Sequence, residues 1–343
     1  MRHFSWGSSS MLMFNILMPV RVLTGMELEK QIQSLREKFD QVKAEVNRIV
    51  IGQEELIEKM LIAIVANGHV LIEGVPGLAK TLLIKTLAKT LGCEFKRIQF
   101  TPDLMPSDII GSKIYDPKTG AFYVRKGPIF TNILLADEIN RAPPKTQSAL
   151  LEAMQERQVT IDVETYKLTP IFIVFATQNP IEHEGTYPLP EAQLDRFLMK
   201  LIINYPERQK EAEILEKYSS MDADELEVKQ IMDINGIIQA QRIVKHIRVE
   251  RPIIEYILDL TYATREHNDV RLGISTRGAL NLLRVAKARA LLHGRFYVTF
   301  HDVKTLVPDV FRHRILLKPE AMLELNVEDI IKEILEKVPL PSL

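Results

Sequence analysis

The chain has 343 residues, of which 46% are hydrophobic and 26% are charged, the usage of a globular protein with room for two domains. Its 44 Lys and Arg nearly balance its 45 Asp and Glu, so the net charge of -1 gives no electrostatic reason to expect a nucleic-acid partner. The lone Cys93 excludes an internal disulfide and favours a reducing cytoplasm, and the 8 His residues show no metal-ligand spacing, so we predict no zinc site.

Residues 1–25 differ from the rest of the chain. The apolar run Met11–Met18 is much shorter than the roughly 20 residues that span a membrane, and no good signal-peptide cleavage site follows it. We therefore expect a disordered leader, or translation that starts at Met26, and no transmembrane segment.

From Met26 the spacing of apolar residues predicts one amphipathic helix that packs on its own domain rather than a coiled coil. Its stripe consists of Leu28, Ile32, Leu35, Phe39, Val42, Val46 and Ile49. Five short runs, mostly apolar, then predict strands at 69–73, 95–100, 132–136, 171–177 and 197–203. Helical patterns at 80–91 and 148–156 lie between them, and this alternation is typical of a wound parallel sheet.

Two segments interrupt the alternation. Lys113–Val124 has strand-forming residues on either side of Asp-Pro-Lys-Thr-Gly, and Gln158–Leu168 has a similar pattern, so both are predicted hairpins. After Pro206 only amphipathic helical patterns remain, at 207–218, 233–246, 252–268, 276–293 and 301–313. We therefore expect a leader at 1–25, an α/β domain at 26–206 and a smaller all-α domain at 207–343.

The stretch GVPGLAKT, Gly74–Thr81, lies between a predicted strand and a predicted helix and departs from the phosphate-loop pattern G-x-x-x-x-G-K-[ST] only at Ala79. Backbone N–H groups of such a loop face phosphates at the positive end of the helix dipole. Lys80 would reach the terminal phosphates and the Thr81 hydroxyl would ligate Mg²⁺. Alanine is acceptable at 79 if its φ is negative, because only a positive φ demands glycine. The alternative is a simple glycine turn.

A second group of polar residues follows two of the predicted strands. Asp137 and Glu138 end the run ILLADE, and Asn179 follows the strand at 171–177. Ligands of α/β sheets bind at such carboxyl ends. Asp137 would hold Mg²⁺ directly or through water, Glu138 would deprotonate the attacking water, and Asn179 would position that water if the two strands are neighbours. Taken alone, an acidic surface pair and an Asn-Pro turn remain alternatives.

Further motifs extend this order along the chain: VIGQ at Val50–Gln53 upstream, and LPEAQLDRF and ISTR downstream. With GVPGLAKT, the long block Ile133–Glu156 and ATQNP, the order resembles that of the AAA+ ATPases and, within them, the MoxR family. The resemblance covers about Val46–Arg314 and has no counterpart for the leader. It implies a P-loop AAA+ domain with a parallel five-stranded sheet and inserted β-hairpins, followed by a helical lid. GVPGLAKT would be the Walker A motif and ILLADE the Walker B motif, and Ala79 fits MoxR-type loops.

The resemblance also implies roles for single residues. Asn179 would be the first sensor, Arg196 an arginine finger that enters a neighbouring subunit's site, and Arg277 the second sensor, which reaches the γ-phosphate from the lid. Because Arg277 lies in the first turn of its predicted helix, where the dipole disfavours a cation, we also expect an anion beside it. The full set of expected nucleotide contacts is Val50, Ile51, Gly74, Val75, Pro76, Gly77, Leu78, Ala79, Lys80, Thr81, Leu82 and Asp137.

The function implied is Mg²⁺-dependent ATP hydrolysis by a cytoplasmic ring, expected to be a hexamer, that remodels partner proteins. Relatives of this kind work with von Willebrand factor A-domain proteins. Two alternatives remain open. One is the ATPase subunit of a metal-chelatase-like complex, which neighbouring genes for tetrapyrrole enzymes would indicate. The other is a DNA-associated motor, which the balanced charge disfavours.

Overall fold

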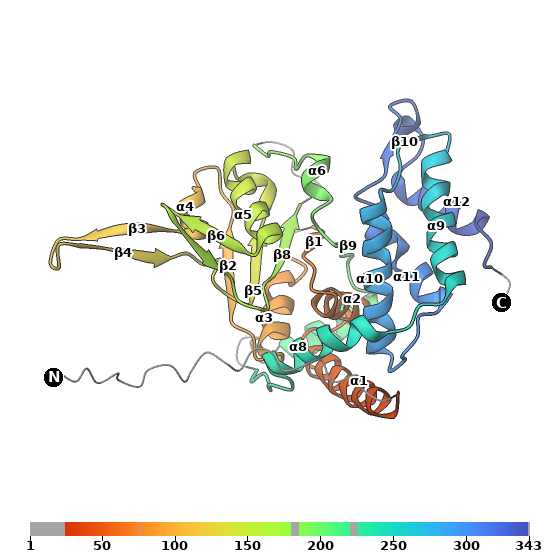
Figure 1. Cartoon of the computed structure of the whole chain (residues 1–343), viewed down its shortest axis with the longest axis horizontal. Helices are drawn as coiled ribbons and strands as arrows, with labels where there is room; N and C mark the ends of the chain where they lie inside the picture. The colour runs from red at the N-terminus through yellow and green to blue at the C-terminus, as the bar shows by residue number, and fades with distance from the viewer. Residues whose placement is uncertain (1–24, 76, 180–184, 220–225, 342–343) are drawn as a thin grey trace, which may run out of the picture.

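The computed structural model describes residues 25–75, 77–179, 185–219 and 226–341. A sheet flanked by helices lies beside a group of mainly C-terminal helices, and a hairpin projects from the side of the sheet away from that group (Figure 1). Apart from Gly25, the predicted leader lies outside the described residues. Among the helices that are described, none has the length and apolar character needed to cross a membrane.

Five parallel strands form the central sheet, as the sequence predicts, and the structure gives their order as β2-β5-β8-β1-β9. They are β1 (Val70–Glu73), β2 (Phe95–Gln99), β5 (Ile133–Asp137), β8 (Ile173–Gln178) and β9 (Met199–Ile202). β5 and β8 are direct neighbours, with Ala136 paired to Ala176, and β8 also pairs with β1. The carboxyl ends of β1, β5 and β8 therefore meet at one edge of the sheet.

Alternate residues of the central strands enter two hydrophobic cores, one on each face of the sheet. Ile72, Leu135 and Phe175 belong to the larger core, which also contains the lid helices. Leu134 and Val174 point the other way, into the core that contains α5 (Pro144–Glu156). Burial on both faces explains why these strands have nearly continuous apolar sequences.

Three helices before and after β1 belong to the larger core: α1 (Gly25–Asn47), α2 (Glu54–Val65) and α3 (Lys80–Thr90). The stripe predicted for α1 is buried at Ile32, Leu35, Phe39, Val42 and Val46, and α1 contacts α3 and α10. The sequence patterns did not reveal α2. Its four charged residues all lie in its first half, and Met60–Val65 is a continuous buried apolar run. Periodicity alone cannot distinguish such a run from a buried strand.

Both predicted hairpins are present. β3 (Gly111–Asp116) pairs with β4 (Ala121–Lys126), and β6 (Gln158–Ile161) pairs with β7 (Glu164–Lys167). The short helix α4 (Pro106–Ile110) leads into β3, and the β3–β4 hairpin extends far from the body (Figure 1). Phe122 and Tyr123 on β4 are exposed. The connections at the sheet edge also contain the 3₁₀ turn η1 (Ile139–Arg141) and α6 (Glu191–Leu194).

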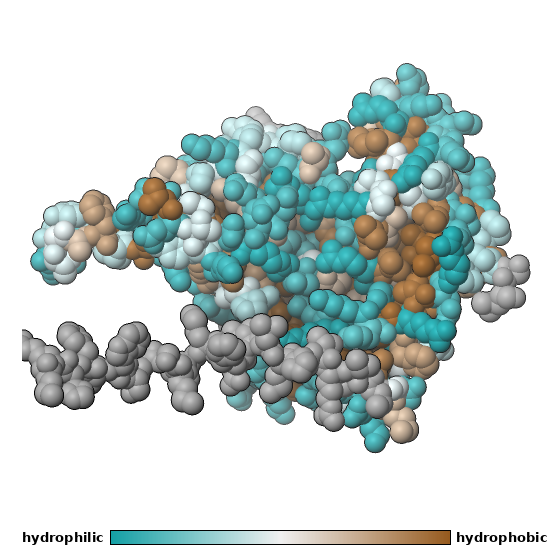
Figure 2. Space-filling model, viewed as in Figure 1, coloured by the Kyte–Doolittle hydropathy of each residue, from teal (hydrophilic) through white to brown (hydrophobic). Residues whose placement is uncertain are grey.

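The region after Pro206 is mainly helical, as predicted. Its helices are α7 (Arg208–Tyr218), α8 (Ile234–Ile243), η3 (Val244–His246), α9 (Arg251–Glu266), α10 (Thr276–Leu292), α11 (Phe300–Phe311), η4 (Ala321–Leu323) and α12 (Val327–Lys337). The structure adds α12 and a small antiparallel sheet of β10 (Val270–Leu272) and β11 (Leu316–Leu317), neither of which was predicted. Apolar residues gather on the visible face over these helices (Figure 2). Leu258 and Tyr262 on α9 and Leu280 on α10 are exposed.

Candidate functional site

The phosphate-loop sequence connects β1 to α3, as its pattern predicts. Gly74 lies so close to the chain after β9 that a Cβ there would be 2.9 Å from the Ile203 carbonyl oxygen. Gly77 has φ +87°, which a side chain would strain. Val75, Leu78 and Leu82 complete the described loop and first turn, and Pro76 lies outside the described residues.

The condition under which alanine at 79 would be free of strain, a negative φ, is not met. The φ of Ala79 is +51° and its ψ is 25°, so alanine occupies the left-handed region at the N-cap of α3. That conformation costs an L-residue roughly 1–2 kcal/mol relative to the right-handed one. The sequence anomaly is therefore also a point of backbone strain, next to the residue expected to meet the terminal phosphates.

Lys80 begins α3 and turns its ammonium back over the loop. Its Nζ donates to the carbonyl oxygens of Gly74, at 2.6 Å, and Val75, at 3.2 Å. Burial lowers the pKa of Lys80, while the negative charges of Asp137 and Glu138 act in the opposite direction. Within the described residues, the partly dehydrated ammonium thus donates to neutral carbonyl oxygens, and a phosphate would be a stronger partner.

The acidic pair lies at the carboxyl end of β5. Glu138 has φ +57° and ψ 52°, a second left-handed residue, and its Oε2 is 3.0 Å from Arg141 Nε. The backbone N–H of Glu138 donates to Thr177 Oγ1 at 2.8 Å, and the Thr177 hydroxyl donates to Asp137 Oδ1 at 2.5 Å. A single hydroxyl from β8 thus fixes both consecutive acidic residues.

Two residues of β2 also contact the acidic pair. Arg97 Nη2 lies 2.6 Å from Asp137 Oδ2, and Gln99 donates to Glu138 Oε2 at 2.6 Å. Sequence reasoning missed Arg97, Gln99 and Thr177. Their only signal was their position in the sequence. Arg97 and Gln99 belong to a strand whose carboxyl end meets the acidic edge, and Thr177 lies within ATQNP, two residues before Asn179.

These groups line one cavity of about 420 Å³, the carboxyl-end cavity. Its lining consists of Gly77, Leu78, Ala79, Lys80, Thr81, Arg97, Gln99, Asp137, Glu138, Thr177 and Asn179. The buried Asn179 arrives there because β8 neighbours β5, which was the condition stated for its expected position. The structure therefore brings together Lys80, Thr81, Asp137, Glu138 and Asn179 from three separate segments.

The oxygen atoms in this cavity fit a magnesium ion. Asp137 offers a carboxylate and Thr81 a hydroxyl, and Mg²⁺ prefers hard oxygen ligands, usually one or two from the protein with the rest from water and phosphate. Within the described residues no cluster of three or more His, Cys, Asp or Glu side chains is arranged to hold a metal ion. A magnesium site that depends on substrate oxygens does not need such a cluster.

The comparisons with known proteins agree with this geometry. Residues 69–199 match the model of the ATPase family associated with various cellular activities (AAA), and residues 262–334 match the AAA lid domain. Chaperone MoxR1 of Mycobacterium tuberculosis is 46% identical over 87% of this chain and 81% of its own length. Protein MoxR of Methylorubrum extorquens is 32% identical over 89% of this chain and 96% of its own length.

This chain belongs to the MoxR family of AAA+ ATPases. YeaC of Bacillus subtilis is a further relative, 48% identical over 86% of this chain and 92% of that protein. The crystal structure of a candidate ATPase from Cytophaga hutchinsonii superimposes with a TM-score of 0.85 at 45% identity, covering 93% of this chain and all of that one. The predicted fold, an AAA+ domain with a helical lid, is thereby confirmed.

A second cavity of about 530 Å³ adjoins the phosphate loop of this MoxR-family chain, and the two share Gly77, Leu78 and Ala79. Its lining is mostly apolar and includes Val50 and Ile51, the residues expected to contact adenine. Tyr205 and Tyr218 line it as well, from the connection after β9 and from α7. Sequence reasoning did not single out these two tyrosines. The cavity suits a flat, uncharged ring attached to phosphates in the neighbouring cavity.

Arg196 and Arg277, the two arginines to which the family resemblance assigns roles, lie outside the lining of the carboxyl-end cavity. Arg196 follows α6, in the connection to β9. Arg277 lies in the first turn of α10, capped by the Ser275 side chain, and its Nη1 is 3.7 Å from Asp195 Oδ2. Asp195 is the anion expected beside that helix terminus. Its other oxygen accepts from the buried Arg314 at 2.7 Å, which connects the lid to the segment that carries Arg196.

Proposed function

We propose that this MoxR-family protein is a Mg²⁺-dependent ATPase that works as a ring, expected to be a hexamer, and remodels partner proteins in the cytoplasm. One observation carries the proposal: Lys80, Thr81, Asp137, Glu138 and Asn179 line a single cavity that adjoins an apolar one. The first is suited to a triphosphate and the second to adenine.

In this proposal the loop N–H groups and the Lys80 ammonium bind the phosphates, and the contacts of Lys80 with Gly74 and Val75 give way to phosphate oxygens. Glu138 takes a proton from the attacking water, and Asn179 orients that water toward the γ-phosphate. Thr81 and Asp137 would hold Mg²⁺, which neutralises charge on the phosphates when bound. Thr177 keeps the two acids in register.

The remaining charge is supplied by arginines that the isolated chain does not bring to the cavity. Arg196 would enter the site of a neighbouring subunit, and a lid movement would transfer Arg277 from Asp195 to the γ-phosphate. An isolated subunit is then a poor enzyme, and ring assembly is part of the catalytic mechanism. The exposed β3–β4 hairpin is suited to contact a client as the lid and sheet move.

Clients of this ring are expected to be proteins, with von Willebrand factor A-domain proteins as the first class to examine. The names of the relatives MoxR1, a chaperone, and MoxR support this direction. We expect no nucleic-acid partner, because the chain carries a net charge of -1.

Glu138→Gln tests the proposal. The variant should bind ATP as the parent does and hydrolyse it at least about a hundredfold more slowly, because the general base is lost. Glu152→Gln, on the exposed face of α5, is the matched control and should keep the parent rate. Turnover of Glu138→Gln at the parent rate would contradict the assigned base.

The same variant, loaded with ATP, should retain its client in affinity capture. Recovery of tetrapyrrole enzymes would favour the chelatase-like alternative. Salt-sensitive DNA binding with DNA-stimulated turnover would favour the motor.

A further inference from the structure

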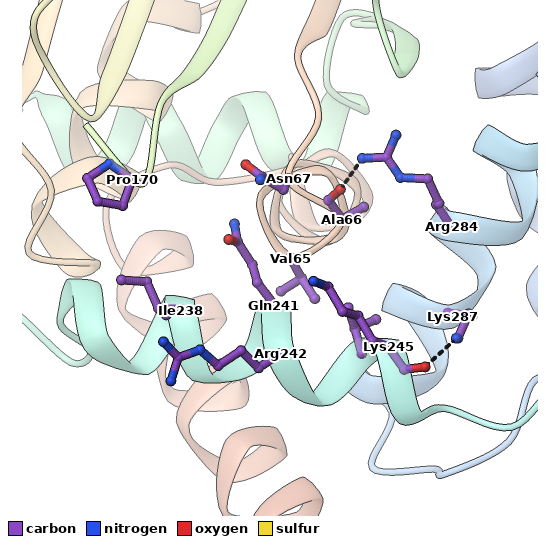
Figure 3. Close-up of a pocket in the computed structure, with 11 residues that line it drawn as sticks. Val65, Ala66, Asn67, Pro170, Ile238, Gln241, Arg242, Lys245, Arg284 and Lys287 are labelled. Atoms are coloured by element: carbon purple, nitrogen blue, oxygen red, sulfur yellow. Dashed lines mark hydrogen bonds between the residues drawn. The ribbon is translucent and has the colours of Figure 1, made fainter. Parts of the chain in front are cut away.

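A third cavity, of about 550 Å³, lies where α2, α8 and α10 meet. It is separate from the carboxyl-end cavity and is called the amino-end cavity. It is bounded by the end of α2 and the chain before β8, and so by the segments that enter the amino ends of β1 and β8. Figure 3 shows its side chains arranged around the last turn of α2. The lining residues are Val65, Ala66, Asn67, Pro170, Ile238, Gln241, Arg242, Val244, Lys245, Arg284 and Lys287.

Four cationic side chains contribute to this lining, and no carboxylate does among the described residues. Arg242 and Lys245 come from α8 and η3, and Arg284 and Lys287 come from α10. Within the described part of the chain, none of these four side chains forms an ion pair with an acidic residue. For a chain whose total charge is -1, this is a strong local excess of positive charge.

Part of that charge has a structural role. Arg284 donates to the Ala66 carbonyl at 2.7 Å, and Arg157, outside the lining, donates to the Asn67 carbonyl at 2.9 Å. These carbonyls lie at the C-terminal end of α2, where the helix dipole contributes roughly half a negative charge. The dipole can offset one arginine in part, but not Arg157, Arg284 and the other three cations together.

Several basic groups around the end of α2 have lowered pKa values, and burial is the largest cause of each shift. Burial lowers the pKa of Arg284 and of Lys287, and it lowers the pKa of Arg157 with a further contribution from the charge of Arg284. Burial together with the charges of Arg157 and Arg284 lowers the pKa of the nearby His69 to about 3. Arg242, Lys245 and Arg284 remain exposed to solvent, so an anion that enters the cavity can reach them.

We propose that this cavity binds a small molecule that carries phosphate groups. Its volume lies in the range of small-molecule sites. One phosphate group carries up to about two negative charges, so two groups balance four cations where four carboxylates would be needed. Val65, Ile238 and Val244 form an apolar wall that suits an uncharged part of the same ligand.

The probe for the experiment is inorganic tripolyphosphate, titrated calorimetrically into the full-length chain in Mg²⁺-free buffer. All proteins in this experiment carry Lys80→Ala, so that the phosphate loop contributes little to the signal, and the protein with this change alone is its parent. Arg242→Gln and Lys245→Gln are the test variants, because replacing Arg284 would also remove a cap from α2. Lys304→Gln, on the exposed face of α11, is the matched control.

The parent should bind tripolyphosphate with an affinity that falls as salt rises, and each test variant should weaken binding about fivefold or more. Lys304→Gln should bind as the parent does. Equal affinities in all variants, or no binding at millimolar probe, would overturn the proposal. Tighter binding of citrate than of tripolyphosphate would reject phosphate as the chemistry. If an acidic peptide bound instead of the probe and lost affinity in the same variants, the cavity would belong to a protein partner.

Discussion

Two charged cavities lie at opposite ends of the strands of the same sheet and are built in contrasting ways. At the carboxyl ends of β1, β5 and β8, Lys80 and Arg97 face Asp137 and Glu138, so cations and acids occur together. In the cavity that adjoins the amino ends of the strands, Arg242, Arg284 and their neighbours have no acidic counterpart among the described residues.

The two cavities differ in whether their charged groups already have partners within the chain. The charged groups of the carboxyl-end cavity already have partners within the chain: backbone carbonyls for Lys80 and Arg97 for Asp137. In the proposed function, a nucleotide and its metal ion would have to replace these partners. The amino-end cavity needs no exchange, because its excess charge is only partly offset. The carboxyl-end arrangement suits repeated exchange of partners during turnover, and the amino-end arrangement suits binding of a ligand without a reaction.

The largest expected effect tests whether the carboxyl-end cavity depends on a neighbouring subunit. Arg196→Ala should keep ATP affinity and lose about 10³-fold in turnover, the scale of a trans arginine finger. Arg208→Ala, at the exposed start of α7, is the control. Mixed assemblies of Arg196→Ala and Glu138→Gln should recover part of the activity, because each subunit type supplies what the other lacks. Absence of recovery, in assemblies shown to contain both types, would count against action in trans.

A smaller effect is expected from Thr177→Val, which keeps the shape of the side chain and removes its hydroxyl. The Glu138 N–H loses its acceptor, at a cost of about 1–3 kcal/mol in the free energy of unfolding, and turnover should fall about tenfold as the acids lose register. Denaturant unfolding and steady-state turnover measure the two effects. Thr165→Val, on the exposed hairpin strand β7, should change neither.

Tripolyphosphate binding at the amino-end cavity should be unaffected by Thr177→Val, because both hydrogen bonds of the Thr177 hydroxyl go to the acidic pair at the other end of the strands. A parallel loss of probe binding would mean that the two cavities are not independent. The comparison between them would then need revision.

The smallest effect is expected at the strained alanine. Ala79→Gly relieves a positive φ, and this gain is reduced by the greater freedom of glycine in the unfolded chain, so a stabilisation of no more than about 1 kcal/mol is expected. Denaturant unfolding with ADP absent is the measurement. A destabilisation of that size would indicate that Ala79 does not adopt the left-handed conformation.

The sequence was informative where local pattern and chemistry coincide. The apolar runs of β1, β5 and β8 are buried on both faces, so their composition predicts a parallel sheet and the position of Asp137 at its edge. The two hairpins have recognisable turns. The phosphate loop was predicted with its flanking strand and helix.

It was uninformative where the outcome depends on contacts distant in sequence or on backbone angles. The positive φ of Ala79 is not encoded by composition, and alanine argues against it. Arg97 meets Asp137 only because β2 pairs with β5 across 40 positions of sequence. The amino-end cavity combines Lys245 with Lys287 through the packing of η3 on α10. β11 has two residues, too few for a pattern.

The central claim is that Lys80, Asp137 and Glu138 act on one triphosphate. ATP affinity tests this claim most directly. Equilibrium titration of Mg·ATP should give Lys80→Ala an affinity at least about a hundredfold below that of the parent, since a charge-assisted contact to phosphate is lost. Lys89→Ala, on the exposed side of the same helix, should bind as the parent does. If Lys80→Ala and Lys89→Ala both bound Mg·ATP with the parent's affinity, the claim would be wrong.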